Sequence, residues 1–316
     1  MKTIVIILFL FFPPDTLSVM FWNVENFFDW RNDSTTVSDL EFSSAGERHW
    51  TWKRFQAKAN AFAKALFWVE GETGRLPDVV GLEEVENAFV LRQVLQKTSL
   101  RKTDYKYVHY DSPDRRGIDV ALLYRSSVLE LIDSKPCHLY AADTVMATRD
   151  VLLCVFRRNS PDSTVMSVLV NHHPSKYGGA TESEPRRRIA VERLRFLADS
   201  LASLGIDRII VGGDFNDTPD NPVFRLLEPA LRPLHMELFR RGQGTIKYDG
   251  KWDLIDHGYV SPAWSTPTMR ILRIPFLLTR DSAHSGEKPL RTYTGPRYTG
   301  GVSDHLPVLL EVRFPP

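Results

Sequence analysis

The sequence has few of the features that would assign it to a specialised class of protein. Only two cysteines, Cys137 and Cys154, occur among its 316 residues, which is too few for a disulfide scaffold, and their spacing matches no zinc motif. One disulfide or two buried thiols is all that they permit. Its 40 basic and 39 acidic residues leave a net charge of +1, so no global field draws the chain to nucleic acid or to an anionic membrane. A local basic groove is still compatible with this balance.

The chain contains one long apolar run, which is too short to cross a membrane as a helix. Residues 4–12 are apolar, follow Lys2 and precede Pro13 and Pro14, whereas a spanning helix needs about 20 such residues. The run has the length of a signal-peptide core, although no A-x-A cleavage site follows it. A buried first strand is the alternative. We favour a signal peptide over residues 1–17, which would direct the protein to a bacterial periplasm or to the outside of the cell.

The rest of the sequence predicts one layered α/β domain over residues 18–316. Length alone allows either two domains of about 150 residues or one large domain, and no linker or repeat divides the chain. The hydrophobic patterns predict strands over residues 18–28, 78–82, 105–110, 120–124, 128–132, 151–156, 165–170, 208–211, 254–260 and 306–312. Apolar residues at helical spacing predict helices over residues 52–69, 89–95 and 194–204.

Polar side chains recur directly after these predicted strands. Because strands tend to deliver their catalytic residues at their carboxyl ends, we expect the side chains to gather at one rim. Carboxylate and amide oxygens without a cysteine or histidine cluster suit Mg²⁺ or Mn²⁺ better than zinc. Each residue alone also has a structural explanation, as a turn, a cap or a satisfied core histidine. The residues are Asn23, Glu84, Asn171, His172, Asp214, Asn216, Asp256, Asp304 and His305.

Eight segments that carry these residues resemble, in the same order, the motifs of the endonuclease/exonuclease/phosphatase family, which includes deoxyribonuclease I-like and AP-endonuclease-like enzymes. The resemblance covers the chain from about residue 18 to its last strand. It implies a four-layered α/β sandwich, with two mixed β-sheets face to face and helices outside, and a Mg²⁺-dependent phosphoesterase. The segments are FWNVEN, GLEEVEN, RGIDVALLYR, TRDVLL, VNHHPSKYGG, GGDFND, LIDHGYVS and GVSDHLPV.

The same resemblance implies a metal site formed by Asn23, Glu84 and Asp304. Glu84 matches the acidic residue of the family's LQE motif, and Glu83 stands where that motif has glutamine. Because adjacent strand residues point to opposite faces, only one of the two glutamates should reach the cation.

The resemblance also implies the catalytic roles of five residues. Asp214 would orient or deprotonate the attacking water, and Asn216 would donate to a non-bridging phosphate oxygen. His305 would contact the phosphoryl group, while Asp256 would accept its other N–H and fix the tautomer. His172 would be a second polar contact at the scissile phosphate.

Three further residues are candidates for substrate binding: Arg149, Asp119 and Arg187. Each has an alternative explanation, since Arg149 and Asp119 could form structural ion pairs and most of the RRR run at residues 186–188 could be a solvated helix face. Three aromatic residues could stack on a base or sugar, although packing is the simpler reading; they are Tyr248, Trp252 and Tyr293.

The resulting prediction is a hydrolase of phosphodiesters or phosphomonoesters, with endonuclease activity among the options. Its substrate could be a nucleic acid, a nucleotide, a lipid or a sugar phosphate, and no obligate protein partner is expected, which favours a monomer. The alternatives are a lipid or sugar phosphodiesterase, or a binding protein that keeps the fold without the chemistry. A lipid enzyme should expose an apolar hairpin, for which residues 274–278 (IPFLL) are the candidate. A core strand explains that segment more simply.

Overall fold

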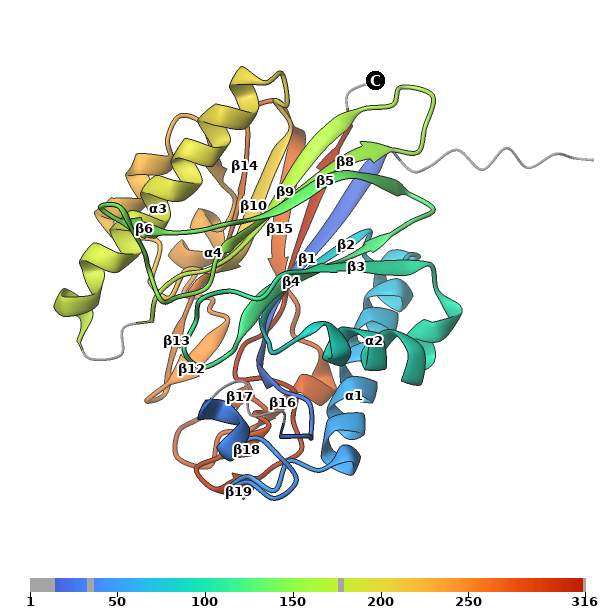
Figure 1. The fold of residues 1–316 in the computed structure, drawn as a ribbon, viewed down its shortest axis with the longest axis vertical. Helices are drawn as coiled ribbons and strands as arrows, with labels where there is room; N and C mark the ends of the chain where they lie inside the picture. The colour runs from blue at the N-terminus through green and yellow to red at the C-terminus, as the bar shows by residue number, and fades with distance from the viewer. Residues whose placement is uncertain (1–14, 33–36, 176–178, 315–316) are drawn as a thin grey trace, which may run out of the picture.

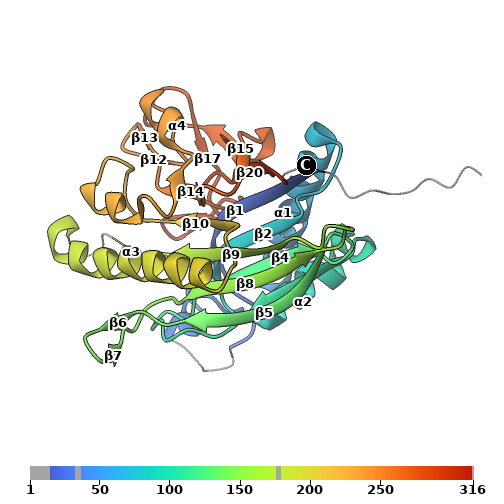
Figure 2. The same ribbon diagram turned by 90° about the horizontal axis from the view of Figure 1, so that it is seen from above.

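Two β-sheets face each other at the centre of the molecule, and helices cover their outer sides (Figure 1 and Figure 2). The structure is a computed structural model that describes residues 15–32, 37–175 and 179–314. Both central sheets have six strands and mix parallel with antiparallel pairs. Helices α1 and α2 pack on one sheet and α3 on the other. This arrangement is the four-layered α/β sandwich that the sequence predicts.

The first central sheet, called sheet 1 below, holds both ends of the described chain. Its order is β15 (Ser265–Ile271), β20 (Val308–Arg313), β1 (Thr16–Phe27), β2 (Val79–Val85), β4 (Asp119–Arg125) and β3 (Tyr105–His109). The second, called sheet 2, has the order β11 (Arg232–Pro233), β14 (Asp256–Val260), β10 (Ile209–Asp214), β9 (Val165–His172), β8 (Val151–Arg158) and β5 (Leu129–Cys137).

Helices and small hairpins surround these sheets. The α-helices are α1 (Trp52–Thr73), α2 (Ala88–Lys97), α3 (Ala180–Ser203) and α4 (Met236–Arg240). Short 3-10 helices are η1 (Val37–Leu40), η2 (Ser99–Lys102), η3 (Pro222–Leu227) and η4 (Pro275–Leu277). Four strand pairs form hairpins: β6 (Tyr140–Ala141) with β7 (Thr144–Val145), β12 (Ile246–Tyr248) with β13 (Lys251–Asp253), β16 (Leu278–Arg280) with β17 (Glu287–Pro289), and β18 (Tyr293–Thr294) with β19 (Arg297–Tyr298).

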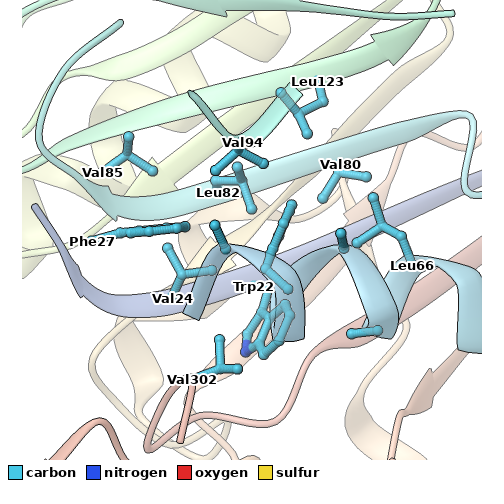
Figure 3. Close-up of a cluster of buried hydrophobic side chains, with 14 of the residues drawn as sticks. Trp22, Val24, Phe27, Leu66, Val80, Leu82, Val85, Val94, Leu123 and Val302 are labelled. Carbon is cyan, nitrogen blue, oxygen red and sulfur yellow. The ribbon is translucent and has the colours of Figure 1, made fainter. Parts of the chain in front are cut away.

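β1 lies in the middle of sheet 1 and is buried on both faces. Trp22 and Val24 point towards α1, whereas Phe21 points into the space between the sheets, as the alternation of a strand requires. Figure 3 shows Trp22 and Val24 packed near Leu66 of α1 and Leu82 of β2. This double burial explains why residues 19–24 include so many large apolar side chains.

Phe21 sets how closely the two sheets approach each other. Its ring lies over Gly81 of β2 and Gly212 of β10, where an added Cβ would sit only 2.5 Å and 2.3 Å from ring atoms. Because real Cβ atoms do not tolerate such distances, both positions require glycine. The strands that carry Glu84 and Asp214 are therefore held together just below the predicted rim.

The structure confirms the predicted helices and lengthens the one predicted at residues 194–204. That helix, α3, begins at Ala180. Its first half is polar and contains Pro185, and both features conceal a helix from pattern analysis. β15 was not predicted, because it is an edge strand with mostly exposed or half-buried residues.

The chain enters sheet 1 earlier than the predicted domain boundary. β1 begins at Thr16, and Leu17, which pairs with Val312 of β20, is fully buried. The boundary predicted after residue 17 therefore falls inside β1, while the apolar run at residues 4–12 lies outside the described residues. Within the described part of the chain, none of the helices is both long and apolar enough to span a membrane.

The two cysteines are free buried thiols. Cys154 of β8 belongs to the core between the sheets, and Cys137 of β5 belongs to the core under α3. Their side chains thus lie on opposite faces of sheet 2, and this geometry leaves no room for a bridge between them.

The IPFLL segment is neither an exposed hairpin nor a core strand. Ile274 and Leu277 are buried in the core under sheet 1, and the segment forms the 3-10 turn η4. The expectation of a core strand was therefore wrong in conformation, although burial explains the apolar residues.

A stack of buried histidines and aromatic residues supports the outer face of sheet 2. The rings of His235 and His257 are stacked with centroids 4.2 Å apart, and Phe215 stacks on His257 at 4.7 Å. Burial lowers the pKa of His235 to about 4 and the pKa of His257 well below its ordinary value. Both imidazoles are therefore neutral in the folded protein at neutral pH.

We expect this stack to make the fold acid-sensitive. A histidine whose folded pKa is lowered stabilises the fold above its unfolded pKa of about 6.5, and this stability is lost as the pH falls towards the folded pKa. For His235 the free energy of unfolding should decrease by about 2 kcal/mol between pH 7 and pH 5. Urea unfolding at both pH values should show a smaller loss for His235→Asn than for the natural chain. His49→Asn, at an exposed histidine, should keep the full loss, and equal pH dependence in all three proteins would contradict this account.

Candidate active site

The carboxyl ends of four strands meet at one edge of the sandwich, called the rim below. β1 runs parallel to β2 in sheet 1, and β9 runs parallel to β10 in sheet 2. Asn23 and Glu84 come from the first pair, and His172 and Asp214 from the second. β14 begins at the same edge, where Asp256 pairs with Asp214.

Asp214 is the carboxylate on which the rim residues converge. Its Oδ2 atom lies 3.1 Å from Nδ2 of Asn23 and 3.2 Å from Nδ2 of Asn216. The same oxygen lies 3.4 Å from Nε2 of His172 and 3.9 Å from Nε2 of His305. Asp214 is itself 2% exposed. A single buried oxygen thus faces side chains from both sheets.

His305 is held in place through its other ring nitrogen. Its Nδ1 lies 2.8 Å from Oδ2 of Asp256, and the Thr245 hydroxyl donates to the same oxygen. The backbone is fixed as well, because the indole N–H of Trp22 donates to the carbonyl of His305 at 3.0 Å. Nε2 is therefore directed towards Asp214 and the rim.

The charges of His305 and Asp214 depend on each other. Burial by itself lowers the pKa of His305, but Asp256 and Asp214 outweigh burial and raise that pKa well above its ordinary value. Burial raises the pKa of Asp214, while His305 acts in the opposite direction. The arrangement is an imidazolium between two carboxylates, with Asp214 poised to accept a proton.

His172 differs from His305 because it is neutral. Its Nε2 lies 3.4 Å from Asp214 and 4.0 Å from Oε1 of Glu84. Burial, and then the positive charge of Arg149, lowers the pKa of His172 well below its ordinary value. A neutral imidazole can donate one hydrogen bond at the rim without adding charge.

Four rim residues have left-handed backbone conformations, which residues other than glycine rarely adopt. Glu25, Asn26, Glu84 and Asn216 have φ values of 47°, 52°, 65° and 51°. The ladder between β1 and β2 shifts register around Glu25 and Asn26, and the ladder between β2 and β4 shifts register at Glu84. Such left-handed positions cost energy and cluster at functional sites, where they direct side chains out of a regular strand.

The two adjacent glutamates of β2 point to different environments, as the alternation predicts. Glu84 is at the rim, where its Oε2 accepts the backbone N–H of Asn26 at 2.8 Å. Glu83 is completely buried, and neither of its carboxyl oxygens has a partner within the described structure. Burial, followed by Asp256 and Asp214, raises the pKa of Glu83 well above its ordinary value. Only Glu84 is available to a cation.

An ion-pair network that the sequence analysis missed lies beside Asp304. Nη2 of Arg291 is 3.0 Å from Oδ2 of Asp304 and 2.9 Å from Oε1 of Glu25. Glu25 also accepts the backbone N–H of Thr292 at 3.0 Å. Glu25 was visible in the FWNVEN segment, but its partners are more than 260 residues away in sequence.

Lys58 completes this network from α1. Its ammonium is buried and donates to the carbonyl of Glu25 and, at 2.9 Å, to the hydroxyl of Thr292. Burial lowers the pKa of Lys58 to about 8, although Glu25 and Glu84 act against this. Pattern analysis missed Lys58 because a lysine on a helix normally lies on its solvated face.

The rim carries oxygen donors of the kind that bind divalent cations, although in the described part of the chain Glu84 and Asp304 do not belong to a group of three ligand atoms within 4.8 Å of one another. Burial is the main cause of the raised pKa of Glu25, and the neighbouring carboxylate of Asp304 adds to it, while Arg291 and Lys58 act in the opposite direction. Glu84 and Asp304, with the amide of Asn23, offer the hard oxygen donors that Mg²⁺ and Mn²⁺ prefer. These are the metal ligands predicted from the sequence.

Arg149 supports the rim indirectly. It is buried, pairs with Asp114 at 3.0 Å, and donates to the carbonyl of His173 at 2.6 Å. The same carbonyl accepts Nδ2 of Asn216 at 3.0 Å. Arg149 therefore positions Asn216 through a shared carbonyl, in addition to forming the structural ion pair considered above.

The other two substrate-binding candidates are engaged with protein partners. Asp119 accepts from Ser112 and lies 3.0 Å from Nε2 of His109. Arg187 bonds to Asp217 at 3.1 Å and to the hydroxyl of Ser183. Among the described residues, His109, Asp111 and Asp119 are the one group of His, Cys, Asp or Glu side chains with three ligand atoms close enough together to hold a cation, and none of them was predicted as a metal ligand.

The three candidate stacking residues have different exposures. Tyr248, at the end of β12, is 78% exposed, whereas Tyr293 is 7% exposed and packs among aromatic rings. Trp252 of β13 is covered on one face by the Arg273 guanidinium, 4.7 Å from the ring centroid. Tyr248 is therefore the most exposed of the three candidates.

The environment of Glu83 leads to a prediction about stability. In the unfolded chain Glu83 is ionised above about pH 4.5, whereas in the folded protein it is not. Glu83 therefore lowers the free energy of unfolding at neutral pH and does not change it below pH 4. In EDTA, Glu83→Gln should therefore unfold at a higher urea concentration than the natural chain at pH 7, and at the same concentration at pH 4.

Glu311→Gln is the matched control, because this residue is a half-buried glutamate on β20. It should show no such pH-dependent gain. A destabilised Glu83→Gln protein at pH 7 would mean that the carboxyl group makes bonds that glutamine cannot replace.

Comparisons with known proteins agree with the geometry. The sequence model described as "Endonuclease/Exonuclease/phosphatase family" matches residues 18–314. A search of curated proteins gives no match.

Solved structures show the same fold at low sequence identity. An endonuclease/exonuclease/phosphatase family protein from Bacteroides thetaiotaomicron is 16% identical, with a TM-score of 0.61 over 95% of this chain and 98% of that one. The human Nocturnin catalytic domain with bound sulfate is 18% identical, with a TM-score of 0.59 and 95% of both chains covered. Mannosyl-6-phosphatase from B. thetaiotaomicron is 15% identical, with a TM-score of 0.59 over 94% of this chain and 100% of that chain.

Proposed function

Since the chain belongs to the endonuclease/exonuclease/phosphatase family, we propose that it hydrolyses phosphate esters with the help of a divalent cation, Mg²⁺ or Mn²⁺. The observation that carries the proposal is the convergence of Asn23, His172, Asn216 and His305 on one oxygen of Asp214. A proton acceptor surrounded by fixed donors suits the attack of water on an anionic phosphorus centre.

Glu84, Asn23 and Asp304 are the residues that would hold the cation. When bound, the cation would polarise the phosphoryl group and neutralise part of its charge. Arg291 keeps Asp304 oriented through the ion pair described above. Asn26 holds Glu84 through its backbone N–H, so the carboxylate is oriented by the protein itself.

Asp214 is the residue that would orient the water and take its proton. Its raised pKa makes it a better proton acceptor than an ordinary aspartate. The backbone N–H of Asn216 donates to Oδ1 of Asp214 at 2.8 Å and fixes the carboxylate plane. The two N–H groups of the Asn216 side chain donate to the carbonyl of His173 and to Oδ2 of Asp214, so Asn216 would donate to a non-bridging phosphate oxygen only by releasing one of these partners.

His305 and His172 would serve the phosphoryl group with different charges. His305, protonated and fixed by Asp256, presents a positively charged N–H where negative charge develops. His172 offers a neutral donor from the opposite sheet. His305 would therefore stabilise negative charge, and His172 would donate a hydrogen bond. The two imidazoles can differ in this way because their environments give them different pKa values.

The proposal predicts metal-dependent hydrolysis that requires both His305 and Asp214. Turnover of bis-p-nitrophenyl phosphate, p-nitrophenyl phosphate, plasmid DNA and RNA would be measured with Mg²⁺, with Mn²⁺ and in EDTA. His305→Ala and Asp214→Asn should each lower the rate of the preferred substrate by about 100-fold or more, as for other acid–base groups.

His284→Ala, at a histidine on an exposed loop, is the matched control and should retain the natural rate. Circular dichroism would verify that the variants are folded. Turnover that persists in EDTA or in both rim variants would refute the mechanism. If the natural protein bound the metal but hydrolysed none of the substrates, the result would favour the alternative of a binding protein that has this fold without catalytic activity.

A further inference from the structure

One imidazole and two carboxylates lie together where β3 ends and β4 begins. Nε2 of His109 is 3.0 Å from Oδ2 of Asp119, and Nδ1 of His109 is 3.9 Å from Oδ1 of Asp111. With one ligand atom taken from each residue, the three atoms all lie within 4.8 Å of one another. This group of three residues, called the β3–β4 site below, offers a mixed set of nitrogen and oxygen ligands.

The strand register and a nearby serine hold two of these ligands in place. His109 pairs with Ala121 of β4, and residues two apart in a strand share a face, so Asp119 points to the same side of sheet 1 as His109. The side chains of His109 and Asp119 are 3% and 4% exposed. The backbone N–H and the hydroxyl of Ser112 donate to Oδ1 of Asp119, which leaves Oδ2 beside the imidazole.

The β3–β4 site is separate from the rim. Asp119 pairs with Val85 of β2, the residue that follows Glu84. The strand order β1, β2, β4, β3 places His109 three strands away from Asn23, which is about 14 Å at the usual spacing of strands. A cation at the β3–β4 site would therefore be a second cation and not the one expected at the rim.

A similar arrangement around His284 shows how carboxylates beside a histidine are satisfied without a metal. The ring nitrogens of His284 lie 3.4 Å from Asp249 and 3.7 Å from Asp281. The ammonium groups of Lys247 and Lys288 lie 3.0 Å and 3.4 Å from Asp281 and neutralise its charge. Two fixed cations of the protein thus occupy the positions that a metal ion would need.

The β3–β4 site has no such fixed cation. In the described part of the chain, the ion pairs of Asp111 and Asp119 are with His109 alone. Asp150 adds negative charge nearby, because burial and, to a smaller extent, the charges of neighbours that include Asp119 raise its pKa. Asp150 is 5% exposed and bonds to His138 through Oδ1, whereas its Oδ2 has no partner among the described residues. Buried carboxylates without a fixed cation are costly, and a bound cation would remove this cost.

Asp111 makes the site accessible and connects it to a loop. Its side chain is 91% exposed, so a cation can enter from solvent and keep water as further ligands. Residues 112–118 form the loop between Asp111 and Asp119, and Asp114 of this loop pairs with Arg149 at 3.0 Å. A cation bound by both Asp111 and Asp119 would hold the two ends of the loop together.

We propose that His109, Asp111 and Asp119 bind a second divalent cation, Zn²⁺ or Mn²⁺, which holds the loop at residues 112–118 in place. An imidazole ligand favours these ions over Mg²⁺ and Ca²⁺, which prefer sites made of oxygen ligands alone. Three protein ligands leave the remaining coordination positions to water. The proposal does not depend on hydrolysis at the rim, because the two sites share no residue.

Zn²⁺ binding to the metal-free full chain, measured by isothermal titration calorimetry in excess Mg²⁺, tests the site directly. His109→Gln and Asp111→Asn should each weaken Zn²⁺ binding at least about tenfold, because even the partners of metal ligands contribute about 10- to 100-fold to affinity. Glu84→Gln at the rim should keep this binding. His284→Gln is the matched control and should also keep it. If His109→Gln unfolds, Asp111→Asn still tests the site, since Asp111 is exposed.

Limited digestion with trypsin tests whether the cation holds the loop. Arg115 and Arg116 are exposed within it, so trypsin should cut there in the metal-free protein. Zn²⁺ should slow this cleavage several-fold in the natural chain and in Glu84→Gln, but not in Asp111→Asn. Cleavage after Arg241, an exposed arginine outside the loop, should not change with Zn²⁺.

Three results would overturn the proposal. One is a natural chain that binds no Zn²⁺ in excess Mg²⁺. Another is Zn²⁺ binding that neither His109→Gln nor Asp111→Asn weakens, or that Glu84→Gln abolishes, because the cation would then lie elsewhere. The third is bound Zn²⁺ that leaves cleavage of the loop unchanged. Failure of the natural chain to hydrolyse any ester would refute the rim mechanism alone and would leave the Zn²⁺ result readable.

Discussion

The structure depends on a buried negative charge at Asp214 that both sheets help to satisfy. Asn23 reaches it from sheet 1 and His172 from sheet 2, while His305 supplies the positive charge. A buried carboxylate is costly unless it is paired and hydrogen-bonded. The same set of partners that makes this charge tolerable also fixes the positions of the groups needed for chemistry.

Close packing of the sheets makes this convergence possible. The ring of Phe21 fills the space between Gly81 and Gly212, so β2 and β10 approach each other just below their carboxyl ends with this ring between them. Beyond that point the strands leave regular geometry, and Glu84 and Asn216 adopt left-handed backbone conformations. The regular part of each strand thus provides rigidity, and its irregular end places the functional side chain.

The residues that end strands were predictable from the sequence, because apolar runs and motif order both point to them. Glu84 and Asp214 belong to this group, whereas His305 lies before β20 and was predictable from motif order alone. Lys58 and Arg291 do not belong to this group, since their roles depend on contacts between segments far apart in the chain. The same reasoning applies to the fold: β1 has an unmistakable pattern, whereas the polar first half of α3 hides a helix whose position is decided by packing on sheet 2.

Anomalous X-ray scattering from crystals grown with Mn²⁺ would locate a divalent cation at the rim. We expect an anomalous peak bound by Glu84, with Asp304 and Asn23 beside it. A peak only at His109, Asp111 and Asp119, or no peak at the rim in crystals soaked with excess Mn²⁺, would show that the rim does not bind the cation.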